Sequence, residues 1–345
     1  MSNPYSISFG IEPAILISRD AEIKTIVNTF NSDTPSSTTF IYTGIRGSGK
    51  TVTMSVLLDK LKDDKHWIIA VLNQNRDLLS ALAANLFEDP FLKPLFIKAD
   101  ISLNLGLNVG LEEKGPADDV EVQLKKMLKV IKKTGRKVLI AIDEAVNNKN
   151  FRIFASSYQM FLIERFPVFL IMTGLYKNIY SLQNEKTLTF LYRAPKYELG
   201  PLNMIAVSNS FKDTLSVTEE EADSLAGLTN GYPYAFQVLG YLMYENREKS
   251  VSEILPQYDE ILWEYSYSKI WSELSRREKE VVSAIINSND TKMSAKDIKS
   301  ITGLTDSSFP TYRRRLGEGG VLSINEYGYC ELALPRFKEI IRRIF

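Results

Sequence analysis

The run of eight residues from Gly44 to Thr51, Gly-Ile-Arg-Gly-Ser-Gly-Lys-Thr, constrains this chain more than any other part of its sequence. It has the pattern G-x-x-x-x-G-K-[ST], in which glycines let successive backbone N–H groups turn towards the phosphates of a bound nucleotide. The Lys50 ammonium would reach the β- and γ-phosphates, and the Thr51 hydroxyl would bind Mg²⁺. A helix that begins at the loop would add its positive N-terminal dipole.

The residues on either side supply the context that such a loop needs. Thr38–Thr43 is β-branched and aromatic, which predicts a strand, and apolar residues recur at helical spacing after the loop. A glycine-rich turn without a ligand is the alternative. We predict a nucleotide site that is bound by Gly44, Ile45, Arg46, Gly47, Ser48, Gly49, Lys50, Thr51 and Val52.

A pair of acids follows a second predicted strand. Lys137–Ile142 is apolar apart from its first residue, and Asp143 and Glu144 come directly after it. Asp143 would hold Mg²⁺ through water, and Glu144 would polarise the water that attacks the γ-phosphate. Acids in this position can also merely cap the next helix. Together with the phosphate loop, the pair predicts a Mg²⁺-dependent hydrolase of nucleoside triphosphates, with Lys50 and Glu144 as catalytic residues.

Two further polar residues are candidates for contact with the γ-phosphate. Thr173 ends the apolar strand Val168–Met172, which could lie beside the acid-bearing strand and direct the Thr173 hydroxyl towards the γ-phosphate or the attacking water. Arg193 could serve as an arginine finger, within the chain or from a neighbouring subunit. An ordinary strand-end threonine and a solvated or structural arginine are the alternatives, and spacing alone does not separate them.

The fold class follows from the order of these patterns. Strands alternate with helices over residues 36–200, which predicts an α/β fold with a parallel-sheet P-loop NTPase core. Residues 204–265 lack a strong strand pattern and are expected to form helices, one of which starts near Thr218. We therefore predict an ATPase core with an N-terminal lead segment over 1–200, a helical lid over 201–268 and a winged helix-turn-helix domain over 269–345.

The winged helix is predicted from the order helix, helix, helix, hairpin near the C-terminus. Helices are expected at Glu278–Ile286, at Ala295–Ile301 with Ser294 as its cap, and up to Leu316 with Thr305 or Asp306 as the cap and Pro310 in the first turn; a hairpin then spans residues 321–334, and a basic helix follows.

Basic residues in this region suggest a partner for it. The expected recognition helix carries Arg313, Arg314 and Arg315, which could reach guanine edges or phosphates of double-stranded DNA. The last helix adds Arg336, Lys338, Arg342 and Arg343. Protein docking or autoinhibition by the winged helix stays open, because the chain has a formal net charge of zero.

One segment fits none of these roles. Residues 101–111 alternate strictly between apolar side chains and Ser, Asn or Gly, which predicts a strand with one buried face, bent or folded at Gly106. An edge strand or hairpin that covers the sheet and an insertion that contacts a partner are both compatible with this alternation.

The overall composition excludes several classes of protein. The chain has 345 residues, one cysteine (Cys330) and one histidine (His66), which argues against a disulfide framework and a zinc site. The first residues have neither a basic nor an apolar leader segment, and apolar runs are far shorter than a membrane span. A cytoplasmic protein without a membrane partner is expected.

The order of these elements resembles an AAA+-type ATPase, in particular the STAND and archaeal ATPase group that is related to origin-recognition ATPases. The resemblance covers nearly the whole chain. It rests on Ser18–Ile23, Gly44–Thr51, Ile140–Glu144, Ile171–Gly174, Arg193 ahead of Leu199–Leu202, and the Gly-Tyr-Pro element of Asn230–Tyr234.

The resemblance implies further site residues. Pro233 would pack near the adenine, the segment around Ile17 and Arg19 would line the base pocket, and Thr173 would be the first sensor. Arg193 would be a finger or sensor arginine. One departure from the group is that no arginine stands close after Gly231 to serve as a lid sensor.

Three functions remain compatible with the sequence. The first is a switch that binds and hydrolyses ATP with Mg²⁺, closes its lid and changes the exposure or DNA contact of the winged helix. The second is a regulator that binds nucleotide without hydrolysis, and the third is a scaffold with permanent ADP. An intact Glu144 favours the first. Self-association is a further possibility that the sequence leaves open.

Overall fold

The chain forms two compact units, each built from more than one segment. The computed structural model describes residues 2–8, 13–101, 120–324, 326 and 328–345. One unit, the sheet unit, consists of residues 19–43 and 53–197; the other, the loop–helix unit, consists of residues 1–18, 44–52 and 198–345. The residues of the phosphate loop therefore group with the C-terminal half of the chain.

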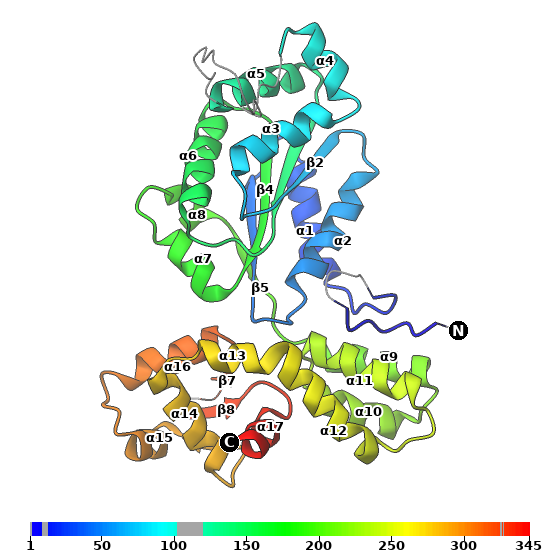
Figure 1. Ribbon diagram of the computed structural model, residues 1–345, viewed down its shortest axis with the longest axis vertical. Coiled ribbons are helices and arrows are strands. Elements are labelled where there is room, and N and C mark those ends of the chain that lie inside the picture. Colours follow the sequence, from blue (N-terminus) through cyan, green and yellow to red (C-terminus); the bar gives the residue numbers. More distant parts are fainter. Residues whose placement is uncertain (1, 9–12, 102–119, 325, 327) are drawn as a thin grey trace, which may run out of the picture. The chain divides into compact units, whose positions relative to one another are not determined.

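The sheet unit is built around a parallel sheet (Figure 1), as the sequence predicts. The strand order is β2-β3-β4-β1-β5, and β4 pairs in parallel with both β1 and β3. Its elements are α1 Asp20–Asn31, β1 Thr39–Thr43, α2 Lys50–Lys62, β2 Trp67–Leu72, α3 Leu78–Glu88, α4 Leu92–Lys98, α5 Val120–Lys133, β3 Lys137–Ile142, α6 Lys149–Ile163, β4 Val168–Gly174, α7 Tyr176–Gln183, α8 Thr189–Arg193 and β5 Lys196–Glu198.

Helices cover both faces of this sheet because its strands are apolar on both sides. Alternate residues such as Ile140 and Leu170 share a core with buried residues of α3, α5 and α6. On the other face, the Phe30 ring of α1 packs against Phe40 and Phe169, with ring centroids 5.4 Å and 5.1 Å apart. Figure 1 shows α1 and α6 on opposite sides of the sheet.

The first part of the loop–helix unit is helical, as the sequence predicts for residues 204–265. The Thr218 side chain accepts a hydrogen bond from the Glu221 N–H, and the Glu221 carboxylate accepts one from the Thr218 N–H, which completes a capping box at the start of α10. The helices are α9 Met204–Leu215, α10 Glu219–Thr229, α11 Pro233–Glu245, α12 Val251–Leu262, the π-helix η1 Trp263–Tyr267 and α13 Ser268–Glu273.

A C-terminal module over residues 276–344 has the predicted order of three helices and a hairpin. Pro310 lies in the first turn of α16, where a missing N–H costs nothing. The expected cap is wrong, because Ser308 and not Thr305 or Asp306 precedes α16. Strand β6 was not predicted; it pairs with β8. The elements are α14 Arg276–Asn287, β6 Lys292–Ser294, α15 Ala295–Thr302, α16 Phe309–Glu318, β7 Leu322–Ser323, β8 Tyr329–Leu332 and α17 Phe337–Ile344.

The alternating segment 101–111 lies outside the described residues except for Ile101, which is buried in the sheet unit. None of the helices in the described ranges has the length and apolar content that crossing a membrane requires.

Candidate nucleotide site

The strand order brings the ends of three site-bearing strands to one edge of the sheet. In the parallel register, Thr43 of β1 pairs with Gly174 of β4, and Met172 of β4 pairs with Ile142 of β3. Asp143 follows β3 directly, and the phosphate loop follows β1. The expectation that the Thr173 strand lies beside the acid-bearing strand is confirmed.

Thr173 holds the backbone of the acid pair in place. Its buried hydroxyl donates a hydrogen bond to Asp143 Oδ1 and accepts one of 3.1 Å from the Glu144 N–H. The Thr173 carbonyl also accepts a hydrogen bond of 2.7 Å from the Ala145 N–H. Glu144 has a φ of +53°, a left-handed conformation that is rare outside glycine and needs such support. The Glu144 side chain itself is exposed, so its carboxylate is available to solvent or a ligand.

The phosphate loop has the backbone that its glycines predict. Gly47 and Gly49 have φ values of +76° and +82°, and α2 begins at Lys50. The Lys50 ammonium is almost fully buried and donates to the carbonyl oxygens of Gly44 at 3.1 Å and Ile45 at 2.7 Å. Thr51 and Val52 lie in the first turn of α2. A loop with this backbone, followed by a helix N-terminus, is of the kind that presents N–H groups to an anion.

The Gly-Tyr-Pro element packs directly on this loop. The Tyr232 hydroxyl donates 2.6 Å to the Arg46 carbonyl and shares a 2.8 Å hydrogen bond with the Ser266 hydroxyl of η1. The Tyr234 N–H donates to the Gly47 carbonyl at 3.2 Å. A side chain at Gly47 would place its Cβ 2.1 Å from the Tyr232 hydroxyl oxygen. Burial raises the pKa of Tyr232, so the hydroxyl keeps its proton and stays a donor.

The C-terminal module contacts the loop as well. A Cβ on Gly320, in the turn between α16 and β7, would lie 2.1 Å from Ile45 Cγ2. The Ile45 side chain packs against the core of the loop–helix unit. Tyr232, Ser266 and Gly320 were not predicted to contact the loop, because they are distant from it in sequence and no local sequence pattern links them to it.

The remaining predicted residues are distributed over both units. Ile17 packs on the core of the loop–helix unit, whereas Arg19 precedes α1 in the sheet unit. Burial lowers the pKa of Arg19, and the nearby Glu22 opposes that shift. Pro233 begins α11, and its Cβ would lie 3.9 Å from a Cβ on Gly49. Arg193 ends α8 with an exposed side chain.

Several basic residues of the C-terminal region make hydrogen bonds and ion pairs within that region. Arg313 donates to the carbonyl oxygens of Tyr329, Ile324 and Glu326 at 3.2–3.4 Å and so supports the hairpin. Arg336 makes a two-pronged ion pair with Asp259 of α12, with N–O distances of 2.5 and 2.8 Å.

The last helix behaves in the same way. Lys338 and Arg342 donate to the carbonyl oxygens of Asp290 and Ser288, and Arg343 lies 3.9 Å from the Asp259 carboxylate. Arg314 and Arg315 on α16 remain exposed. These basic residues are evident in the sequence, but their carbonyl and carboxylate partners could not be predicted from it.

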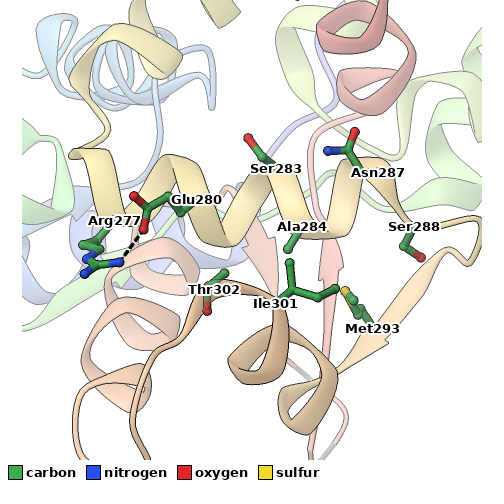
Figure 2. Close-up of a pocket in the computed structure, with 9 residues that line it drawn as sticks. All are labelled: Arg277, Glu280, Ser283, Ala284, Asn287, Ser288, Met293, Ile301 and Thr302. Atoms are coloured by element: carbon green, nitrogen blue, oxygen red, sulfur yellow. Dashed lines mark hydrogen bonds and ion pairs between the residues drawn. The ribbon is translucent and has the colours of Figure 1, made fainter.

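A hollow of about 470 Å³ lies elsewhere in the C-terminal module (Figure 2). Ala284 of α14, Met293 of β6 and Ile301 of α15 form its apolar part, and the Arg277–Glu280 ion pair of 2.7 Å lies at one end. Its lining includes no residue predicted to bind nucleotide. The hollow is therefore separate from the candidate nucleotide site.

Comparison with known structures identifies proteins of similar fold. The ORC2 protein of Aeropyrum pernix, solved as ADPNP–ADP complexes, superposes with a TM-score of 0.64 over 98% of this chain and 96% of that one, at 13% sequence identity. The chain therefore shares the α/β fold of that protein.

Two other structures match over similar lengths. The Cdc6p protein of Pyrobaculum aerophilum has a TM-score of 0.49 at 14% identity and covers 98% of this chain and 96% of its own. The A. pernix ORC1 protein in complex with DNA has a TM-score of 0.48 at 14% identity, with coverage of 98% and 97%.

Two family models match separate parts of the chain. Residues 16–169 match an ATPase domain predominantly from Archaea, and residues 264–341 match a domain of unknown function (DUF8462). A comparison with curated protein sequences found no significant match.

Proposed function

We propose that the chain is an ATP-binding and ATP-hydrolysing switch, in which the state of the phosphate loop is transmitted to the helical lid and to a C-terminal winged helix. The observation that carries this proposal is the direct contact of the loop with both regions. Tyr232 and Tyr234 bind the carbonyl oxygens of Arg46 and Gly47, and Gly320 packs on Ile45. A ligand that changes the loop must change these contacts.

The roles of the site residues follow from their chemistry. Lys50 and the loop N–H groups would bind the phosphates, and the Thr51 hydroxyl and Asp143 carboxylate are hard oxygen ligands of the kind that Mg²⁺ prefers. The metal would neutralise charge on the phosphates. Glu144 would take the proton of the attacking water, and Thr173 would hold Glu144 in position through its N–H. Arg193 would stabilise the γ-phosphate, and Ile17, Arg19 and Pro233 would line the base.

The similarity to the ATPase family model and to a structure solved as ADPNP–ADP complexes supports this reading. A second candidate is a nucleotide-binding regulator that uses the winged helix for protein docking. Arg313 and Arg336 form hydrogen bonds within the chain, which leaves Arg314 and Arg315 as the arginines of α16 that could contact DNA. This favours protein docking over DNA contact by this module.

Steady-state phosphate release tests the hydrolase. The Glu144→Gln protein should bind ATP normally but release phosphate at least about 100-fold more slowly, because a general base contributes about that factor. The Lys50→Ala protein should lose ATP affinity and keep its fold. Equal, near-zero release from wild type and Glu144→Gln, with and without DNA, would contradict hydrolysis. Unchanged ATP affinity in Lys50→Ala would contradict the site itself.

A further inference from the structure

One surface of the sheet unit combines cations with exposed tyrosines. α7, α8 and β5 follow β4 in one continuous stretch, and α7 packs against α8. Residues 175–197 carry one acid, Glu185, and four bases, which are Lys177, Lys186, Arg193 and Lys196. We call this surface, together with the start of α6, the α6–α8 face.

The start of α6 belongs to this face through a hydrogen-bonded link. Asn147 donates to the Ser181 hydroxyl of α7 at 3.0 Å and accepts from Arg152 of α6 at 3.1 Å. Arg152 and the exposed Lys149 thereby extend the positive charge. Figure 1 shows α7 and α8 next to the lower end of α6.

Five cations of this face have no carboxylate partner in the described part of the chain. Lys149, Arg152, Lys186, Arg193 and Lys196 form no ion pair with any residue that the structure describes. Lys125 of the adjacent helix α5 behaves differently, because it pairs with the carboxylates of both Glu121 and Glu164 at about 3 Å. Uncompensated cations of this kind attract a polyanion.

The same helices, α7 and α8, also carry exposed tyrosines. Tyr192 is 73% exposed and Tyr180 is 46% exposed. The Tyr180 ring stacks on Tyr176 with centroids 6.1 Å apart, and Lys196 Nζ lies 4.9 Å from the Tyr176 ring centroid. A flat ring beside a cation suits a nucleobase beside its phosphate.

We propose that the α6–α8 face binds single-stranded nucleic acid, with Tyr180 and Tyr192 as stacking platforms and Lys149 and Lys186 as phosphate contacts. Bases of a single strand are free to stack on these rings, whereas the bases of a duplex are not. This contact is separate from the winged helix and does not require hydrolysis of ATP.

Fluorescence anisotropy with a labelled mixed-sequence 20-nucleotide DNA strand, free and annealed to its complement, tests the proposal on the full chain. Tyr180→Ala/Tyr192→Ala should weaken single-strand binding at least about 30-fold, since two stacked bases are lost and each contributes roughly 1–3 kcal/mol. Tyr180→Phe/Tyr192→Phe keeps both rings and should bind as wild type. Lys149→Ala/Lys186→Ala should reduce the slope of log K against log salt by about 1.4, about 0.7 for each phosphate that the protein no longer neutralises.

Lys129→Ala/Lys133→Ala on α5 is the control, because it removes two exposed charges outside this face and should leave affinity unchanged. The Lys50→Ala protein should still bind the strand without nucleotide, which separates this test from the nucleotide site. Wild-type affinity in the Tyr→Ala pair overturns the proposal. So does equal or tighter binding of the duplex, or a change in the protein's oligomeric mass without strand binding, which would identify the face as a subunit contact.

Discussion

The Tyr232 hydroxyl is a single group that joins the phosphate loop to η1. It donates to the Arg46 carbonyl and meets the Ser266 hydroxyl in a place where both tyrosine and serine are buried. A buried carbonyl that loses its donor costs the free energy of its desolvation. This one oxygen therefore sets how firmly the loop is held in the loop–helix unit.

Tyr232→Phe should lower the free energy of unfolding by about 1–3 kcal/mol, because the Arg46 carbonyl and the Ser266 hydroxyl lose their partner. Urea denaturation followed by circular dichroism measures this. Tyr234→Phe is the matched control, since the described residues offer its hydroxyl no hydrogen bond and its hydrogen bond to the loop comes from its backbone N–H. Equal stability of the two variants would mean that the Tyr232 hydroxyl does not hold the loop.

The Asp259–Arg336 pair joins α12 to the start of α17. The Asp259 side chain is 5% exposed, so Arg336→Ala should cost up to about 3–5 kcal/mol by leaving a buried carboxylate with only the longer contact to Arg343 at 3.9 Å. Adding Asp259→Asn should recover part of that loss. Arg276→Ala, which breaks a pair whose arginine is 93% exposed, should change stability by less than about 1 kcal/mol. If Arg276→Ala and Arg336→Ala lowered the free energy of unfolding equally, burial of the Asp259–Arg336 pair would not contribute to stability.

At the scale of elements, the turn from α16 to β7 is where the C-terminal module meets the loop. Gly320 has a φ of +66°, and so does Gly303 at the end of α15. A Cβ on Gly303 would meet nothing within 4 Å, whereas one on Gly320 would strike Ile45. The two glycines thus have the same φ and differ in the space that a Cβ would find.

Gly303→Ala should cost about 1 kcal/mol through its left-handed backbone alone. Gly320→Ala should cost about 1–3 kcal/mol more, because Ile45 must move to admit the methyl group. Thermal or urea unfolding of both variants gives the difference, and the ATP affinity of Gly320→Ala should fall with it. Indistinguishable variants would show that Ile45 and Gly320 are not in contact in solution.

Elements with strong local patterns were predicted well from the sequence. The parallel strands and the helix that starts at Lys50 follow from apolar runs and loop chemistry. A helix starts directly after Thr218, and Ser294 caps its helix, both as expected. The short helices α4, α7 and α8 and strand β6 were missed because their stability comes from tertiary packing and not from local periodicity. Ser308 precedes α16 without a capping hydrogen bond, so no cap signal marks that boundary.

At the scale of the whole molecule, the grouping of the phosphate loop with residues 198–345 could not be predicted. Sequence reasoning assigned the loop to a core of residues 1–200, because it follows β1 and precedes α2. The contacts that regroup it come from Tyr232, Tyr234 and Gly320, which are distant in sequence. The acid pair and Thr173 were predicted from strand ends, and their mutual hydrogen bonds follow from the β3–β4 pairing.

The central claim is that nucleotide at the loop changes the C-terminal module, and hydrogen–deuterium exchange tests it most directly. In the Glu144→Gln protein, where ATP would persist, addition of ATP and Mg²⁺ should change amide exchange over residues 44–51 and also over 232–234, 263–267 and 316–323. Lys50→Ala should show none of these changes. Protection that is confined to residues 44–51, with the α16–β7 turn unaltered, would contradict the coupled switch.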